Sequence, residues 1–209
     1  MAYKDVCVMT ELSSYPRATR AAGRQTRRAL VDASARLFEG RGLADVSAAD
    51  IARAAGTFPS QITYYFGSKE ALFVEAACRG VLYAATEAEQ AGRRTRTPRS
   101  YVRAVVHAAL NSPALLSFAE AALLVRRRPE LAPRVQETFA RLHSEAERAI
   151  AESLIKRGWQ IRADAAIEAR GFWAAMLGVV LESAASGDTF NEATAEATVQ
   201  LVLNLYEEP

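Results

Sequence analysis

Apolar and small side chains recur along this chain with the period of an α-helix. The clearest case places five residues on one helical face at i, i+3, i+4, i+7 and i+8, namely Leu30, Ala33, Ser34, Leu37 and Phe38. Gly40 and Gly42 follow directly and predict the end of this first helix. No segment alternates apolar and polar residues as a half-buried strand would. The pattern therefore predicts an all-α fold.

Caps and breakers divide the chain into nine expected helices. Ser47 is a good N-cap for a short second helix, Asp50 is placed to complete a capping box, and Gly56 ends the helix within two turns. The remaining helices are expected, in chain order, at Pro59 to Tyr65, Lys69 to Ala91 behind a Ser68 cap, after Thr97-Pro98, after Ser112-Pro113, from between Pro129 and Pro133 to about Gly158, from an Asp164 cap to about Ser186, and from Asn191 to about Tyr206.

Composition favours helix and excludes several classes of protein. Alanine fills 43 of the 209 positions, whereas Gly and Pro together fill 18, and half of the residues are hydrophobic, so a disordered chain is excluded. Cys7 and Cys78 have no ligand-like spacing, so neither a disulfide framework nor a zinc site is expected. The longest uncharged apolar stretch, Gly171 to Leu181, is too short for a membrane span, which needs about 20 residues. We expect a cytoplasmic protein.

Charge is concentrated near the start of the chain. Residues 17–69 hold nine basic and four acidic side chains, a net of +5, whereas residues 70–209 hold 16 basic and 18 acidic, a net of −2. Such a basic segment either meets a polyanion or is a solvated surface. We expect residues 1–23 to form a flexible basic arm. Its Arg17 and Arg20, with the adjoining Arg24, either enter a DNA minor groove or remain in solvent.

The second and third expected helices carry the sharpest motif. Ala52, Gly56 and Ile62 stand at positions 5, 9 and 15 of a window that begins at Ala48. In a helix-turn-helix, the small residue lets the helices approach, the glycine allows the tight turn, and the aliphatic residue anchors the recognition helix. By itself this spacing also occurs by chance in helical hairpins.

The residues around this motif favour a helix-turn-helix over a chance helical hairpin. The segment Thr26 to Leu72, and above all Tyr64-Tyr65-Phe66-Gly67-Ser68-Lys69-Glu70-Ala71-Leu72, closely resembles the DNA-binding domain of the TetR family of bacterial regulators. The resemblance implies a helix-turn-helix domain at residues 24–70, a helical ligand-binding and dimerisation domain at residues 71–209, and a homodimer that leaves its DNA operator when a small molecule binds. It also implies that Ser47 bonds a DNA phosphate, that Gln61, Thr63 and Tyr64 lie on the recognition helix, and that Tyr65 and Lys69 hold the DNA backbone. Arg24, Phe58 and Ser60 complete the expected DNA-contacting residues.

Two positions depart from the family pattern. Phe58 replaces the small polar cap of the third helix, so Thr57 is expected to cap it, and Ala49 replaces a basic residue. Phe58 either meets a thymine methyl group or packs between helices. Of the two tyrosines that follow, one is expected to join Phe66 in the core.

The C-terminal domain has two expected functional surfaces. Residues 172–181 and 199–206 are apolar nearly all round, which indicates cover from the chain's own core on one side and from a second subunit on the other, or full burial within a monomer. The expected dimer contacts are Gly171, Ala174, Gly178, Leu201 and Leu205. Bulky residues with a few polar groups line a ligand cavity or form plain core; the candidates are Leu115, Phe118, Glu120, Phe139, His143, Phe172, Trp173 and Met176. Among them, Glu120 faces a cationic ligand or pairs internally with an arginine.

Catalytic motifs are missing from the sequence. It contains no GxSxG, GxGxxG, P-loop or HExxH pattern, so we expect neither enzymatic activity nor a cofactor. The best interpretation is a ligand-responsive repressor that binds a palindromic operator as a homodimer. The alternative is a helical small-molecule-binding or scaffolding dimer with a vestigial DNA-binding domain.

Overall fold

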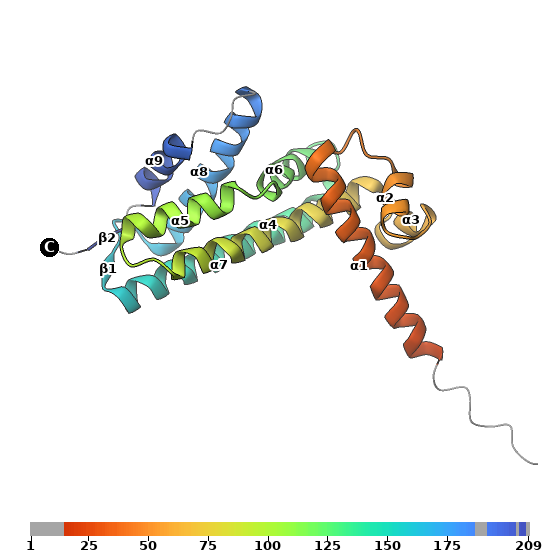
Figure 1. The fold of residues 1–209 in the computed structure, drawn as a ribbon, viewed down its shortest axis with the longest axis horizontal. Coiled ribbons are helices and arrows are strands. Elements are labelled where there is room, and N and C mark those ends of the chain that lie inside the picture. The colour runs from red at the N-terminus through yellow and green to blue at the C-terminus, as the bar shows by residue number, and fades with distance from the viewer. Residues whose placement is uncertain (1–14, 187–191, 204, 208–209) are drawn as a thin grey trace, which may run out of the picture.

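The structure is a computed structural model that describes residues 15–186, 192–203 and 205–207, and Figure 1 shows them as an assembly of helices. Its elements are α1 (Tyr15–Arg41), α2 (Ala48–Ala54), α3 (Ser60–Phe66), α4 (Lys69–Arg93), α5 (Pro98–Leu110), α6 (Ala114–Leu124), the 3-10 turn η1 (Pro129–Leu131), α7 (Ala132–Arg157), β1 (Trp159–Gln160), α8 (Ala165–Ser186), α9 (Glu192–Val202) and β2 (Tyr206–Glu207). The all-α expectation is therefore confirmed. None of the helices in the described ranges combines the length and the hydropathy that a membrane span requires.

Two expected boundaries are wrong. Helix α1 begins at Tyr15, so residues 15–23 are helical rather than a flexible arm; residues 1–14 lie outside the described part. This stretch lacks an apolar stripe, but its alanines and arginines are strong helix formers, and Pro16 suits a first turn. Helix α9 ends at Val202, and the chain then forms β2, where Tyr206 pairs with Gln160 of β1 in a short antiparallel ladder.

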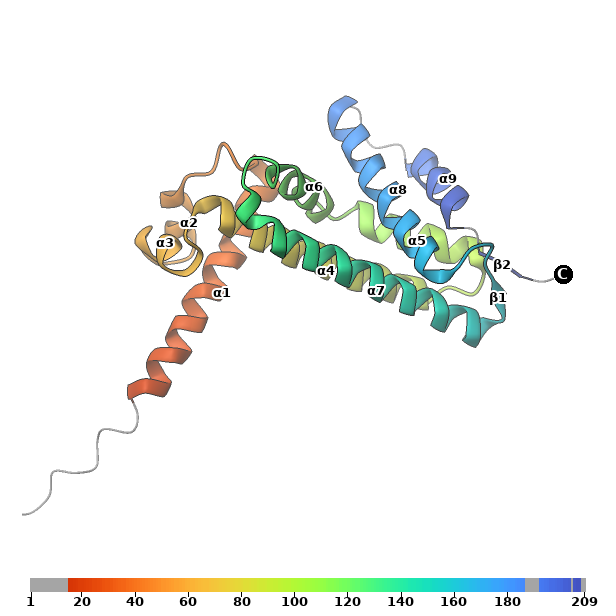
Figure 2. The ribbon, with the colours of Figure 1, turned by 180° about the vertical axis from the view of Figure 1, so that it is seen from behind.

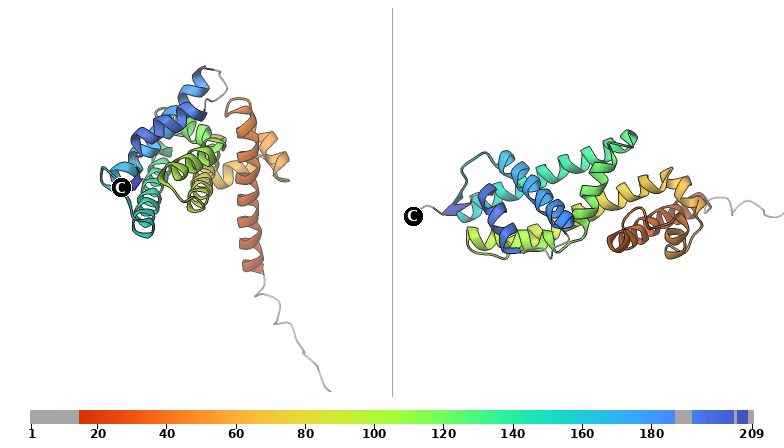
Figure 3. Two further views of the ribbon diagram at one scale, coloured as in Figure 1. Left: turned by 60° about the vertical axis from the view of Figure 1, so that its left-hand side comes forward. Right: turned by 90° about the horizontal axis from the view of Figure 1, so that it is seen from above.

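The helices form two regions joined by α4. Helices α1, α2 and α3 gather at one end of the molecule, and α4 runs from them into the larger region (Figures 1 and 2). There α4 packs against α5, α6 and α7, and α8 packs on α7 and α9. In Figure 3 the N-terminal part of α1 projects away from the rest of the molecule.

The start of α4 belongs to the core of the smaller region. Ser68 caps this helix by accepting a hydrogen bond from the Ala71 backbone N–H at 3.0 Å. Leu72 and Phe73 are buried, and the Phe73 ring meets Phe38 of α1 edge to face at 4.9 Å between centroids. One continuous helix is thus part of both regions. A displacement of one end of α4 can therefore be transmitted along the helix to the other end.

Candidate DNA-binding surface and ligand cavity

Helix α2 is fixed at its start by the predicted capping box. The Asp50 backbone N–H donates to Ser47 Oγ at 3.1 Å, and the Ser47 backbone N–H donates to Asp50 Oδ2 at 3.2 Å. The Ser47 hydroxyl also donates to Asp50 Oδ2 at 2.7 Å, and these bonds from Ser47 lower the pKa of the Asp50 carboxyl. The hydroxyl that we expected on a DNA phosphate is therefore used inside the domain.

The turn between α2 and α3 follows the helix-turn-helix expectation. Gly56 has φ of 64°, a conformation that favours glycine, and the Thr57 backbone N–H donates to Ala52 O at 2.9 Å. Ala52 and Ile62 are buried, as the motif requires. Thr57 does not cap α3, because the N-cap is Pro59 and no side chain bonds to the free amides there.

Helix α3 turns a mixed polar and aromatic face to solvent. Tyr64 is 77% exposed and Phe58, just before the helix, is 74% exposed. Ser60 and Thr63 are also exposed, and Gln61 is half-buried. Of the two alternatives for Phe58, packing between helices does not occur in this structure. The face offers an amide, hydroxyls and ring edges, the groups that read bases and hold phosphates.

Tyr65 and Phe66 turn toward the body of the protein. Both rings are half-buried against the core, which agrees with the expectation that Phe66 and one of the two tyrosines join the core. A Cβ built on Gly23 would lie 3.1 Å from the Tyr65 hydroxyl oxygen, so α1 passes very close to this ring. The Arg27 guanidinium of α1 lies 5.0 Å from the Phe66 ring centre, a cation–π distance. The N-terminal half of α1 is thus tied to the recognition helix.

Lys69 is engaged within the domain. Its Nζ donates to Leu43 O at 2.9 Å and to Val46 O at 2.8 Å, and so binds the loop before α2 to the start of α4. An ammonium has three N–H donors, so one remains for a phosphate. Arg24, in contrast, is exposed on α1.

A small cavity lies in the C-terminal domain between α4, α5, α7 and α8. Its volume is about 50 Å³, and its walls are mostly alanine, aliphatic and aromatic side chains with two carboxylates, Glu89 and Glu145. Phe172 and Trp173 line it, and Trp173 Nε1–H donates to Leu142 O at 3.1 Å. Tyr101 also lines it, and burial raises the pKa of this phenol. A hollow of about 240 Å³ adjoins it and shares Glu89, Tyr101 and Ala149.

The other expected ligand residues lie elsewhere. Leu115, Phe118 and Met176 are completely buried in the core. Phe139 is half-buried against the Phe118 ring at 4.9 Å, and His143 lies near Phe139. Neither lines the cavity of Phe172 and Trp173.

Glu120 faces a different part of the molecule. Its side chain lies on α6 and lines an open groove beside Leu43 and Phe73, where desolvation raises the pKa of the carboxyl. Arg126 and Arg127 line the same groove, but among the described residues neither forms an ion pair with Glu120. The expected internal pairing of Glu120 is therefore not found.

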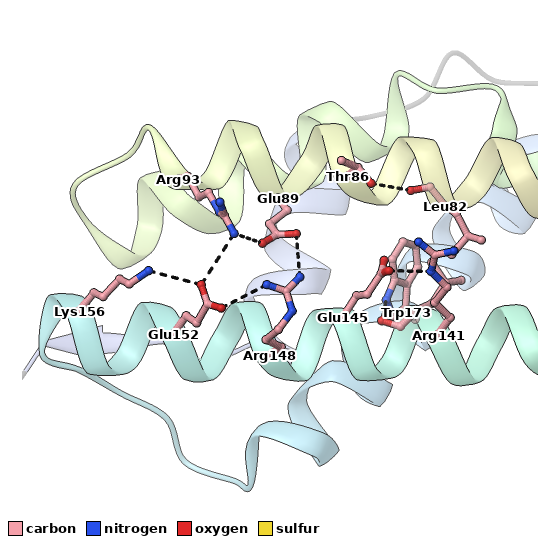
Figure 4. A network of polar contacts seen from close by, with 11 residues as sticks. Leu82, Thr86, Glu89, Arg93, Arg141, Glu145, Arg148, Glu152, Lys156 and Trp173 are labelled. Carbon is pink, nitrogen blue, oxygen red and sulfur yellow. Dashed lines mark hydrogen bonds and ion pairs between the residues drawn. The ribbon is translucent and has the colours of Figure 1, made fainter.

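An ion ladder of five side chains joins α4 to α7 beside the cavity (Figure 4). Glu89 of α4 accepts hydrogen bonds from Arg93 at 2.6 Å and from Arg148 of α7 at 3.4 Å. Arg148 also donates to Glu152 at 3.2 Å, and Lys156 donates to the same carboxylate at 3.5 Å. Glu89 also lines the cavity, whereas Arg93, Glu152 and Lys156 line the adjoining hollow together with Glu89.

A stripe of exposed apolar residues follows one face of α8. Ile167 is 63% exposed, Leu181 is 40% exposed, and Ala174 and Gly178 are exposed between them. On the neighbouring α9, Leu201 is 83% exposed. Exposed apolar surface of this extent is typical of a protein–protein contact.

Two expected dimer contacts have other roles. A Cβ on Gly171 would lie 2.5 Å from Val202 Cγ1, so this glycine permits close packing of α8 on α9 within the chain. Leu205 lies beyond α9 and is buried. The remaining candidates for a subunit contact are Leu201 and the α8 stripe, which we define as Ile167, Ala174, Gly178 and Leu181.

Sequence reasoning missed the polar residues around the cavity. Glu89, Tyr101 and Glu145 come from three helices, and only their contacts in space bring them together. The pairs at i and i+4, such as Glu89 with Arg93 and Arg141 with Glu145, were visible as spacings. The bond between Arg148 and Glu89 joins residues 59 apart and had no local signal. Within the described ranges, no cluster of three or more His, Cys, Asp or Glu is placed to hold a metal.

Family models match both regions of the chain. Residues 30–76 match the family described as bacterial regulatory proteins, tetR family, and residues 98–202 match bacterial transcriptional repressor C-terminal. Among curated relatives, the HTH-type transcriptional regulator BetI of Brucella anthropi is 31% identical over 83% of this chain and 89% of its own length. BetI of Rhizobium meliloti is 33% identical over 58% of this chain and 52% of its own length. These families and relatives are regulators, not enzymes.

Solved structures agree with this fold. A transcriptional regulator of Rhodococcus sp. RHA1 superposes with a TM-score of 0.77 at 37% identity, covering 85% of this chain and 94% of the other. The regulator FadR of Bacillus subtilis, in complex with stearoyl-CoA, has a TM-score of 0.58 at 14% identity, covering 84% of this chain and 97% of the other. At 14% identity the likeness shows the fold alone.

Proposed function

Because the chain belongs to the TetR family and is a transcriptional regulator, we propose that it represses transcription by binding a palindromic operator as a homodimer. The exposed face of α3, with Gln61, Thr63 and Tyr64 held on a buried Ile62, is the observation that carries this proposal. Such a face fits a major groove, and one short recognition helix reaches only a few base pairs. A regulator that binds chromosomal DNA acts in the cytoplasm.

The residues expected to contact bases and phosphates differ in their exposure to solvent. Phe58, Ser60, Thr63 and Tyr64 project from the surface, and Gln61 offers an amide beside them. Tyr65 and Lys69 stand at the edge of this face, and Arg24 extends it along α1. Because residues 15–23 are helical, they do not fit a minor groove about 6 Å wide, so we assign Arg24 to the phosphate backbone rather than to the groove.

Dimerisation is proposed through the α8 stripe and Leu201. Two copies of this surface would bury apolar side chains that a monomer leaves in water, and the small Ala174 and Gly178 would let the helices approach closely. The pairing would be two-fold symmetric, which matches a palindromic site.

The effector is proposed to bind in the cavity of Phe172 and Trp173. At about 50 Å³ the cavity is far smaller than ligand pockets of roughly 300 Å³ or more, so an effector must widen it. A ligand that binds only the widened form shifts the population toward it. The cavity wall includes α4, which carries the change to the DNA-binding domain.

The decisive experiment is selection of binding sites from a randomised DNA pool with the full chain, followed by titration of the selected site. We expect a two-fold symmetric site with half-sites about one helical turn apart, or a multiple of it, and a saturable complex. A chain that binds all pool sequences equally would instead be the scaffolding dimer with a vestigial DNA-binding domain.

A second experiment tests the cavity. Ala149→Leu fills the space between the cavity and the adjoining hollow, whereas Ala140→Leu adds the same atoms at an exposed site on α7. In a screen of small molecules for operator release, compounds active on the wild type should fail on Ala149→Leu and still act on Ala140→Leu. Equal release from both variants would place the effector elsewhere.

A further inference from the structure

Glu75 occupies an unusual position on α4. Its carboxylate accepts from Arg27 of α1 at 3.2 Å on one side and from Arg134 of α7 at 2.9 Å on the other. The side chain is about one-fifth exposed, and Arg134 is one-third exposed, so these bonds are partly sheltered from water. One carboxylate therefore contacts both a helix of the DNA-binding domain and a helix of the C-terminal domain.

The contact continues to the recognition helix. The Arg27 guanidinium that bonds to Glu75 also lies 5.0 Å from the ring centre of Phe66, the last residue of α3. Arg134, Glu75, Arg27 and Phe66 thus form one chain of contacts across four helices. Among the described residues, Glu75 is the one acidic partner of Arg27. The position of the Arg27 guanidinium therefore depends on this carboxylate.

A second ion pair fixes the same part of α4. Arg128, in the connection between α6 and η1, donates to Glu70 Oε2 at 3.3 Å. Glu70 and Glu75 are about one and a half turns apart on α4. This helix therefore holds the middle of the segment that joins α6 to α7 through Arg128, and the first turn of α7 through Arg134. Movement of that segment would therefore displace the start of α4, which contacts the DNA-binding domain.

We propose that Glu75 is a positioning residue for DNA binding, which couples Arg134 of the C-terminal domain to the recognition helix through Arg27. With Arg134 present, two charge-assisted bonds hold the carboxylate between its partners, and Arg27 stays over Phe66. Loss of Arg134 frees the carboxylate to rotate toward Arg27 and shifts that guanidinium on the ring. The inference rests on the proposed DNA-binding function.

The test is a double-mutant cycle on the selected operator, with full-length protein. Arg134→Met is compared with the wild type, and the same change is made in a Glu75→Gln background. We expect Arg134→Met to weaken operator binding at least threefold in the wild-type background and to have no effect once Glu75 is Gln. Arg134→Lys, which keeps the charge, should recover most of the wild-type affinity.

Two controls separate positioning from general damage. Arg141→Met removes an exposed arginine of the same helix that pairs with Glu145, and Glu137→Gln removes the other partner of Arg134; neither should alter operator binding. The active fraction of each preparation is measured by stoichiometric titration, because a merely structural defect lowers that fraction and leaves the affinity of the folded molecules unchanged. Equal effects of Arg134→Met in both backgrounds, or no effect in the wild type, would overturn the proposal. A wild type that selects no operator would instead refute the DNA-binding function itself.

Discussion

In the DNA-binding domain the groups available to a partner project from the surface around short helices. In the C-terminal domain they line a small cavity or spread over one long helix. Tyr64 and Phe58 are exposed on a frame fixed by one capping box and one glycine turn. Trp173 and Phe172 are buried, and helices distant in sequence surround them. A change in the first region should therefore alter single contacts, and a change in the second should alter assembly or the response to ligand.

The largest effect is expected far from the DNA-binding face. Gly178→Glu places a charge in the middle of the α8 stripe, where a dimer would bury it without a partner. A penalty of several kcal/mol corresponds to roughly 100-fold or greater loss of operator affinity, although the DNA-binding domain is untouched. Sedimentation should show a helical monomer.

The control for this change adds the same charge on another helix. Ala140→Glu, at an exposed position of α7, should remain dimeric and bind normally. If Gly178→Glu also remains dimeric, the subunit contact does not lie on the α8 stripe.

An intermediate effect is expected at Lys69, because this side chain stabilises the DNA-binding domain itself. Lys69→Met leaves Leu43 O and Val46 O without their donor and should lower the free energy of unfolding by about 1–3 kcal/mol. Binding to all DNA sequences should weaken alike, with a smaller salt dependence. Thermal melting and titrations at several salt concentrations measure both. Lys156→Met, at an exposed rung of the ion ladder, should cost less than about 0.5 kcal/mol.

The most selective effect, confined to one base position in each half-site, is expected at Gln61. Gln61→Ala should cost about 1–3 kcal/mol at one base position in each half-site and relax the preference there. Stability should barely change, since the side chain is only half-buried. The exposed Gln136 of α7 gives the matching control, because Gln136→Ala should leave the preference intact. Equal losses on operator and random DNA would remove Gln61 from the base-reading set.

The two regions also differ in how far the sequence predicts them. The Ser47–Asp50 capping box, the Gly56 turn and the buried Ile62 all follow from neighbours within a few residues, so local rules suffice for the DNA-binding domain. Thr57 is the exception, because α3 begins at Ser60 behind Pro59 without a side-chain cap.

The C-terminal domain depends on contacts that have no local signal. Its helix starts at Thr97 and Asp164 were predictable from caps, but the choice of cavity-lining residues was not. Aromatic residues such as Phe118 and Phe172 have the same helical spacing, and only the packing of other helices puts the first in the core and the second on the cavity wall. The end of α9 was missed for the same reason, since Tyr206 forms its ladder with Gln160, far away in sequence.

The placement of the tryptophans has an optical consequence. The sequence contains two, Trp159 and Trp173, and both lie in the C-terminal domain with 3% of their surface exposed. Intrinsic tryptophan fluorescence therefore originates entirely in the half of the molecule that holds the cavity, and the DNA-binding domain contributes only tyrosine emission. Trp173 borders the cavity, and the Arg157 guanidinium lies 4.6 Å from the Trp159 ring centre, so the two indoles have different surroundings. If the effector binds in this cavity as proposed, a change in tryptophan emission should report its binding, while tyrosine emission alone comes from the DNA-binding domain.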